Sequence, residues 1–518
     1  MSWPDGWILI PLLPLLAALW IGVGMLTGGR VGEAGERGTA RIALFAVGGS
    51  LLALLLLDLM ALIQGPPGHR IYFPWLVSGE FRVTVSLLLD RPGLFMATLS
   101  AAGCLVTLRF SVEYLHREAG FHRFFAILSL FAGGMLTIAL AGNLVITFIG
   151  WELAGLASYL LISYMRDRAT AAENATRAFV TNRFGDAGLL LAMAMAVMWG
   201  AGLEWPELFL ASHQHLSPPV PIVAFGLVIA ALAKSAQLPF SAWIARALEG
   251  PTPSSAVFYG ALMAHAGIFL VIRAEPLLWH APVLMALLLL LGMLTAVFAS
   301  AIGRVQTDVK SALIYATLAQ LGLMFAACGA GYFDLALWHL VAHASWRLYQ
   351  FLLSPSYLHL GEGAVRPVPE WLGQSHDLYN LALHRGWLDT LTDALITRPT
   401  MALARDARMF EELVINRMAG RPLRETLLAA RAEWNDFSTV VEGSGIGVAG
   451  GRGMFGRVLE RAALVLSWIE EQFVLKSSGD GLVKVLAFLG SYLTRAEQSL
   501  GETRYLILMI VLTFLIIL

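Results

Sequence analysis

The sequence predicts an all-α, polytopic membrane protein with about twelve transmembrane helices. Of its 518 residues, 58% are hydrophobic and only 14% are charged, whereas soluble domains carry roughly 25% charged residues. The mean hydropathy is +0.70, and apolar runs of the length that spans a bilayer, about 20 residues, recur along the chain. A net charge of −1 leaves no excess of basic residues for binding nucleic acid, so we expect none as a partner.

The first candidate span runs from Trp7 to about Met25. It is long enough to cross a membrane and lacks the basic leader and small-residue cleavage site of a signal peptide, so we expect it to be retained. By the same length criterion about eleven spans precede residue 355 and one lies at the C-terminal end. Their approximate centres are Leu16, Leu54, Gly103, Gly133, Leu153, Leu191, Val228, Ala264, Leu291, Leu321, Val341 and Ile510.

The segment Arg70–Leu89 differs from its surroundings. It alternates apolar and polar residues on both sides of Ser78-Gly79-Glu80, a pattern typical of a β-hairpin. We predict a short hairpin outside the membrane. With the first three spans it makes up the N-terminal region, residues 1–115.

The distribution of arginine predicts the orientation of the chain, because cytoplasmic loops are enriched in Arg and Lys. The loops after the first, third, fifth, seventh and ninth spans contain Arg30, Arg37, Arg41, Arg117, Arg166, Arg168, Arg177, Arg246 and Arg304. The alternate loops are nearly free of these residues; the exceptions are Arg70, Arg82, Arg91 and Arg273. We therefore expect both termini on the outer, periplasmic face of a bacterial inner membrane.

The character of the sequence changes after about Pro355. Residues 356–500 are rich in charge, and Val458–Phe473 and Leu482–Arg495 place apolar residues at helical spacing without being apolar enough to span. This pattern predicts cytoplasmic amphipathic helices that dock a partner subunit or lie along the membrane. Residues 501–518 are the last predicted span. The glycine-rich Gly443–Gly456 lacks the strand and the Lys-Ser/Thr of a nucleotide-binding loop, so it is interpreted as a linker.

Several predicted spans carry ionisable residues, which are costly at membrane depth and usually mark an ion pathway. Glu152 and Lys234 both lie near the middle of strongly apolar runs. Pro239, five residues after Lys234, predicts a broken helix, which membranes tolerate around a cavity or buried protein. His265 and Lys310 are further candidates. For these two, a packing histidine and a lysine that extends to the membrane surface are equally good interpretations.

The eleventh span offers three more candidates. His339, His343 and Arg347 follow one another at four-residue intervals, so they lie on one face of a helix. Histidines titrate near neutral pH and relay protons well, while a lysine near a glutamate can alternate between holding and releasing a proton. A metal site at His339 and His343 is disfavoured because no carboxylate or cysteine accompanies them and Arg347 would repel a cation. We predict a proton pathway, with no metal, cofactor or enzymatic reaction in this chain.

Short motifs in the first 355 residues resemble the antiporter-like subunits of respiratory complex I and the related subunit of Mrp sodium/proton antiporters. They are Phe148–Ile162, Thr181–Gly188, Lys234–Pro239, Leu248–Ser255 and Gln306–Ser311; Leu378–Leu403 is a looser match. The resemblance implies that residues 116–355 form an antiporter-like translocation core. It further implies that Glu152 and Lys234 are an ion pair of the first channel, and that Lys310, His339 and His343 lie on a central hydrophilic axis.

The chain departs from the family pattern in three respects. Tyr259 stands where the family usually has a histidine, Arg347 stands where it has a lysine, and amphipathic sequence replaces the spans that would follow the eleventh. In this form the chain is most similar to the membrane subunit of the DAB inorganic-carbon accumulation complexes. That resemblance implies a large, zinc-containing, carbonic-anhydrase-like partner, with proton flow coupled to CO2 hydration there. The alternatives are a subunit of an NADH- or ferredoxin-quinone oxidoreductase and a sodium/proton antiporter subunit.

Overall fold

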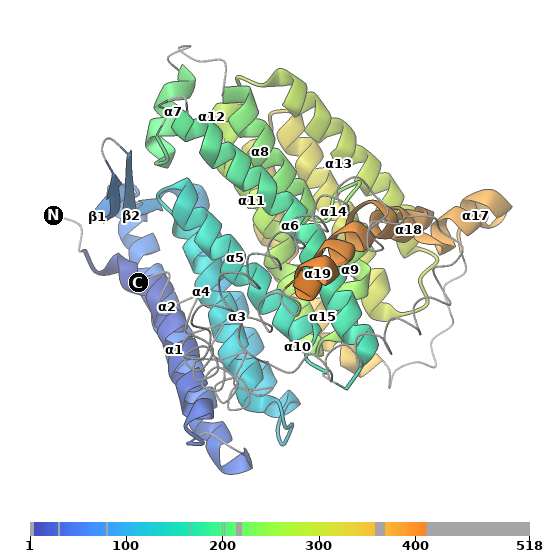
Figure 1. Cartoon of the computed structure of the whole chain (residues 1–518), viewed down its shortest axis with the longest axis horizontal. Helices are drawn as coiled ribbons and strands as arrows, with labels where there is room; N and C mark the ends of the chain where they lie inside the picture. The colour runs from blue at the N-terminus through green and yellow to red at the C-terminus, as the bar shows by residue number, and fades with distance from the viewer. Residues whose placement is uncertain are drawn as a thin grey trace, which may run out of the picture. The chain divides into compact units, whose positions relative to one another are not determined.

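The computed structural model describes residues 5–29, 32–78, 81–165, 167–198, 200, 202–213, 220–357 and 368–410. Within these ranges the chain is helical except for one two-stranded sheet and the connecting loops (Figure 1). Residues up to Thr397 belong to one compact unit, and α19 (Arg398–Phe410) belongs to another and is described by itself. The all-α, polytopic class predicted from the sequence is confirmed.

The N-terminal half of the bundle is arranged around one buried helix, α4 (Phe121–Leu140). In its apolar stretch 94% of the residues are buried, because neighbouring helices cover it on every side. Gly134 of α4 and Gly150 of α5 (Leu144–Ile162) let the two backbones meet, since a Cβ at Gly150 would lie 2.8 Å from the carbonyl oxygen of Gly134. The helices of this half are α1 (Leu9–Leu26), α2 (Gly32–Gln64), α3 (Arg91–Tyr114), α4 (Phe121–Leu140) and α5 (Leu144–Ile162), with the short η1 (Asp5–Ile8) before α1.

The second half of the bundle contains more helices, and several of them are short or irregular. In chain order the elements are α6 (Ala169–Met198), α7 (Trp205–His213), α8 (Val220–Lys234), α9 (Ala242–Arg246), η2 (Ala247–Glu249), α10 (Thr252–Ser255), the π-helical η3 (Ala256–Ala261), α11 (Met263–Arg273), α12 (Glu275–Leu278), α13 (Pro282–Gly303), α14 (Val309–Gly329) and α15 (Phe333–Tyr357).

The first eleven predicted span centres all fall on helices of the structure. Eight helical segments of the described chain are long and apolar enough to cross a membrane by themselves. The centres at Leu191, Val228 and Val341 lie on the other three: α8 is only 15 residues long, and α6 and α15 carry more polar residues. These three helices therefore depend on protein neighbours to stay in the bilayer. The twelfth predicted span, centred near Ile510, lies outside the described residues.

The helix break expected near Lys234–Pro239 is present. Helix α8 ends at Lys234, and a non-helical segment leads to α9. The freed backbone groups find partners inside the protein: Trp243 Nε1 donates to the carbonyl of Ala233 at 3.1 Å, and Gln237 Nε2 donates to that of Ser235 at 3.0 Å. Because buried side chains satisfy the broken backbone, it does not have to face lipid.

The predicted hairpin is also confirmed, as β1 (Gly68–Ser78) and β2 (Phe81–Leu89) pair antiparallel. It lies at one end of the bundle, where Leu87 bridges to Ala141 at the end of α4 (Figure 1). Arg273 at the end of α11 also reaches this end and pairs with Asp90 at 2.6 Å. Arg273 is buried and ion-paired, so it does not act as an exposed charge in a loop. This explains one of the exceptions to the predicted distribution of arginine.

Loops predicted to lie on one side of the membrane do meet at one end of the bundle. On the arginine-rich side, Glu36 near the start of α2 pairs with His116, which follows α3, at 2.8 Å. Arg123 at the start of α4 donates to the carbonyl of Tyr164 after α5 at 2.7 Å. The alternation of the spans is therefore as predicted, while the assignment of this end to the cytoplasm remains a prediction.

A buried carboxylate, Glu204, joins the hairpin to the bundle. It accepts hydrogen bonds from Thr84 and Ser86 of β2, each at 2.6 Å, from His69 of β1 at 2.9 Å, and from Asn143 at 3.1 Å. Asn143 is also the N-cap of α5, the helix that carries the first candidate site residue. Burial by itself would raise the pKa of Glu204, but the four donors outweigh it and the pKa lies below its ordinary value of 4.5.

The Glu204→Gln substitution tests this junction through its pH dependence. A carboxyl group whose pKa is lowered on folding stabilises the fold above its unfolded pKa, and this contribution is lost as pH falls through the folded pKa. We expect the variant to be less stable by about 2 kcal/mol at pH 7. The difference should shrink below the group's ordinary pKa of 4.5. Thermal unfolding of the detergent-solubilised protein at pH 7 and at a pH below 4.5 measures the difference in stability between variant and wild type. Glu207→Gln, which changes an exposed carboxylate, is the control. A difference that does not change with pH would contradict the assignment.

After α15 the described chain packs against the arginine-rich end of the bundle. Asp389 accepts two hydrogen bonds from Arg246, at 3.0 and 2.6 Å, and Asp393 pairs with Arg177 at 3.0 Å. The elements of this segment are α16 (Glu370–Gly373), α17 (His376–Leu383), η4 (Arg385–Trp387), α18 (Leu388–Thr392) and the π-helical η5 (Asp393–Thr397). They confirm helices at the start of the predicted amphipathic region; Val458–Phe473, Leu482–Arg495 and Gly443–Gly456 lie outside the described residues.

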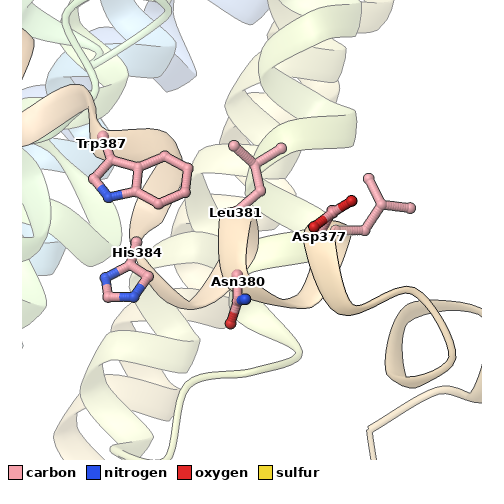
Figure 2. A pocket seen from close by; sticks show the side chains of 6 residues that line it. Asp377, Asn380, Leu381, His384 and Trp387 are labelled. Carbon is pink, nitrogen blue, oxygen red and sulfur yellow. The ribbon is translucent and has the colours of Figure 1, made fainter.

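A pocket opens beside α17 and the turn that follows it (Figure 2). It is lined by Asp377, Asn380 and Leu381 of α17, among others, and by the stacked rings of His384 and Trp387, whose centroids lie 5.4 Å apart. The pocket is open to its surroundings and holds no cluster of ionisable groups aimed at a common point. It therefore offers no catalytic arrangement, and the candidate site lies elsewhere.

Candidate functional site

Lys234, the last residue of α8, lies at the centre of the first group of candidate residues. Its side chain is fully buried, with only 1% of the residue exposed. The ammonium Nζ donates to the backbone carbonyl of Trp151 at 3.3 Å and lies 4.7 Å from the centre of the Trp151 ring. The end of a broken helix thus places a buried amine against an aromatic face and a carbonyl group, both of which favour a cation.

Three charged side chains lie around this amine. Arg183 of α6 pairs with Glu152 of α5 and, at 2.8 Å, with Asp186 one turn further along α6. Asp186 is buried and accepts a hydrogen bond from Trp151 Nε1 at 2.7 Å. The charges of Asp186, Arg183 and Glu152 all act on Lys234. A compact network of two acids and two bases therefore links α5, α6 and α8.

The structure corrects one expectation about this network. Glu152 and Lys234 are close, but Glu152 forms its ion pair with Arg183, and no carboxylate of the described chain forms an ion pair with Lys234. The physical reason is that Arg183 offers several donors to two carboxylates at once. Gly155 leaves room for this arrangement, because a Cβ there would lie 3.2 Å from Arg183 and 3.4 Å from Lys234.

His265 and His343 form the second group. They come from α11 and α15, both are buried, and His265 Nε2 lies 3.1 Å from His343 Nδ1. His343 Nε2 in turn accepts a hydrogen bond from Arg347 Nε at 3.1 Å. His339 lies one turn away and contacts Gln320 of α14 at 2.9 Å. The three residues predicted on one face of α15 are thus confirmed as neighbours, and His265 joins them from another helix.

Hydrogen-bond chemistry fixes the positions of the protons in this chain. A guanidinium can only donate, so His343 Nε2 must be an acceptor and the proton of the neutral ring sits on Nδ1. That N–H donates to His265 Nε2, which places the proton of His265 on its own Nδ1. His265 Nδ1 is buried and has no hydrogen-bond partner among the described residues. The hydrogen-bond donors of this chain therefore all point the same way, from Arg347 to His343 and from His343 to His265.

The two groups are connected through the helix break. Ser235, next to Lys234, donates through Oγ to the carbonyl of Ala264 at 2.7 Å, and His265 follows Ala264 directly. Gly267 permits this close approach, since a Cβ there would lie 2.2 Å from Ser235 Oγ. The candidate residues of α8 and α11 consequently belong to one continuous buried region.

Lys310 contacts neither group through a hydrogen bond or an ion pair that the structure describes. It lies in the first turn of α14, half-buried, and makes no hydrogen bond or ion pair with any residue that the structure describes. Its place on the pathway remains a prediction.

Tyr259, which stands where the family usually has a histidine, is buried in η3 beside Trp243, and its hydroxyl has no partner in the described part of the chain.

Sequence reasoning missed Arg183, Asp186 and Gln320. The first two lie within Thr181–Gly188, one of the motifs that carry the family resemblance. Their spacing of three residues on a helix was an available signal, because it places opposite charges side by side. Gln320 gave no such signal, since a neutral amide in an apolar helix is ordinary without its neighbour.

Two family descriptions match the chain, and together they cover just over half of it. The family described as "NADH:quinone oxidoreductase/Mrp antiporter, TM" matches residues 141–364. The family described as "NADH-Ubiquinone oxidoreductase (complex I), chain 5 N-terminus" matches residues 75–125. The first match contains every candidate site residue.

Curated proteins give the same result. The chain is 35% identical over 366 residues to NAD(P)H-quinone oxidoreductase chain 5 of Synechocystis sp., covering 69% of this chain and 53% of that one. It is 36% identical over 364 residues to the protein of the same name from Picosynechococcus sp., with coverages of 69% and 54%. The chain therefore spans about half the length of these relatives.

Solved structures agree on the fold. A chain of the Mrp complex from Dietzia sp. superposes with a TM-score of 0.57 at 27% identity, covering 66% of this chain and 37% of that one. A chain of the archaeal membrane-bound sulfane sulfur reductase gives 0.55 at 20% identity, with coverages of 66% and 55%, and supports the fold alone. These names support the broader of the two resemblances and make no reference to inorganic carbon. The chain belongs to the family of antiporter-like membrane subunits of complex I and Mrp antiporters.

Proposed function

We propose that this multi-pass membrane protein translocates protons as one subunit of a complex I-like or Mrp-like assembly in a bacterial inner membrane. The observation that carries the proposal is the buried amine of Lys234 at the end of a broken helix, surrounded by Glu152, Arg183 and Asp186. Ionisable groups at this depth are retained where ions or protons pass.

The arrangement suits protons better than larger solutes. The groups contact one another or the backbone directly, as Lys234 does with Trp151 and His343 with His265. Among the described residues no group of three or more His, Cys, Asp or Glu side chains could hold a metal ion. A proton can pass through such contacts by exchange along hydrogen bonds, whereas a hydrated cation needs open space and oxygen ligands.

A potential-driven flux assay tests this function. Proteoliposomes containing the chain and the subunits that purify with it are given a potassium diffusion potential, and a trapped pH dye reports proton entry. We expect proton flux that depends on this chain and persists without sodium. Flux that requires sodium would favour the sodium/proton antiporter alternative, and equal flux from liposomes prepared without the chain would reject proton translocation by it.

The finer assignment, to inorganic-carbon accumulation with a zinc-containing, carbonic-anhydrase-like partner, rests on sequence departures from the family. Tyr259 and Arg347 are the residues concerned. The names of the relatives favour an oxidoreductase or Mrp complex instead, so this assignment takes second place. Identifying the co-purifying subunit distinguishes them: a zinc protein supports carbon accumulation, and a NADH- or ferredoxin-oxidising protein supports the oxidoreductase.

A further inference from the structure

Helix α15 presents an apolar, aromatic face that no described element covers. Trp338, Trp346 and Tyr349 are each more than half exposed, and Leu335 is 60% exposed. Ala342 and Ser345 lie between them on the same face and are exposed as well. Small residues between large aromatic ones form a surface on which a second helix can pack closely.

A charge without a counter-ion among the described residues lies at the edge of this face. Arg347 is half-buried, and within the described part of the chain it donates to two neutral groups, His343 at 3.1 Å and Gln350 at 2.7 Å. No carboxylate of the described chain forms an ion pair with it, although Arg183, Arg246 and Arg273 all have acidic partners. An arginine does not lose its proton in a protein, so this positive charge requires an anion from elsewhere.

A lipid phosphate is too far away to supply that anion. Helix α15 has 25 residues, and Arg347 lies about 3 Å along the axis from its midpoint. The hydrocarbon core extends about 15 Å to either side of the membrane centre. An arginine side chain at this position cannot reach the headgroups without distorting the bilayer.

The last predicted span of this chain offers no acid at that depth. Residues 501–518 contain one acidic residue, Glu502, which stands at the beginning of the predicted span. An acid on a transmembrane helix of another polypeptide meets the requirement.

We infer that the exposed face of α15 binds a transmembrane helix of a partner subunit whose Asp or Glu side chain pairs with Arg347 near the middle of the membrane. The apolar residues around that acid pack on Trp338, Trp346 and Tyr349. The docking and the ion pair are argued from the geometry of α15. Only their role in proton translocation rests on the proposed function. Docking is measured by covalent capture, so a loss of proton flux and a loss of docking are distinguishable.

Zero-length cross-linking in native membranes tests the ion pair. In the Arg347→Lys variant a primary amine replaces the guanidinium, and the membrane-permeant reagent dicyclohexylcarbodiimide activates buried carboxyl groups. Attack by the amine forms an amide bond and releases dicyclohexylurea. We expect mass spectrometry to find a peptide containing position 347 joined to an acidic residue in an apolar segment of another chain. A link to an acid of this chain, or no link in correctly inserted protein, would overturn the inference.

Photocross-linking covers the case in which the lysine variant does not insert. Benzoylphenylalanine at position 346, with Arg347 intact, should give one discrete protein adduct, and the yield should fall at least fivefold when Arg347→Gln is added. The matched control is position 45, where Phe45 on α2 is 77% exposed and lipid adducts alone are expected. Lipid adducts alone at position 346, or a protein adduct that Arg347→Gln leaves unchanged, would contradict the pairing.

Discussion

Replacing Lys234 with methionine is expected to lower proton translocation on the order of 10²-fold, the typical contribution of a positioned acid–base group. The amine is fully buried and bonded to the Trp151 carbonyl, inside a network of two acids and one arginine. Methionine fills the same space without a proton to exchange. Proton flux into proteoliposomes at matched protein content measures the effect.

Two companion variants separate charge from proton exchange. Lys234→Arg keeps the positive charge but cannot release its proton, so we expect it to be as inactive as the methionine variant. Arg304→Ala removes an exposed cation from the arginine-rich end and should retain normal flux. Wild-type flux in a correctly inserted Lys234→Met protein would remove Lys234 from the pathway.

Much of the fold could be predicted because its determinants are local. Apolar runs of spanning length located eleven helices, and alternation around Ser78 located the hairpin. The break after Lys234 followed from Pro239, since a proline cannot donate its backbone nitrogen to a helix. The π-helical turn η3, in which Gly260 lies against Phe351 of α15, has no such local signal in the sequence.

The sequence predicted most residues of the candidate site, but not which of them form ion pairs with one another. Helical spacing placed His339, His343 and Arg347 on one face, and the structure has them in contact. The partner of Glu152 could not be obtained in this way. Choosing between Lys234 and Arg183 depends on how α5, α6 and α8 pack, which spacing along one helix does not encode.

The order of protons in the histidine chain was likewise invisible to the sequence. It depends on one contact, the donation from Arg347 Nε to His343 Nε2. A lysine at this position could lose its proton and then accept one, but an arginine donates permanently. Adding a proton to His343 Nε2 would set two donors against each other, so the contact with Arg347 must open first. We therefore propose Arg347 as a positioning residue that controls when His343 accepts a proton.

The last prediction concerns His343 and distinguishes a relay from a packing histidine. Asparagine at this position can still donate a hydrogen bond toward His265, yet it cannot take up a proton near neutral pH. We therefore expect His343→Asn to insert and assemble normally while proton flux falls on the order of 10²-fold.

Arg347→Gln preserves a donor toward His343 but removes the fixed charge that favours proton release. That variant should keep partial flux with its pH–activity profile moved to higher pH, whereas Arg347→Leu, which lacks a donor, should lose most flux at every pH. The measurement is proton entry into proteoliposomes between pH 6 and 9, roughly the range in which histidine-dependent relays respond. If His343→Asn conducts like the wild type, the histidines are packing residues and the proton path runs from Lys234 by another route.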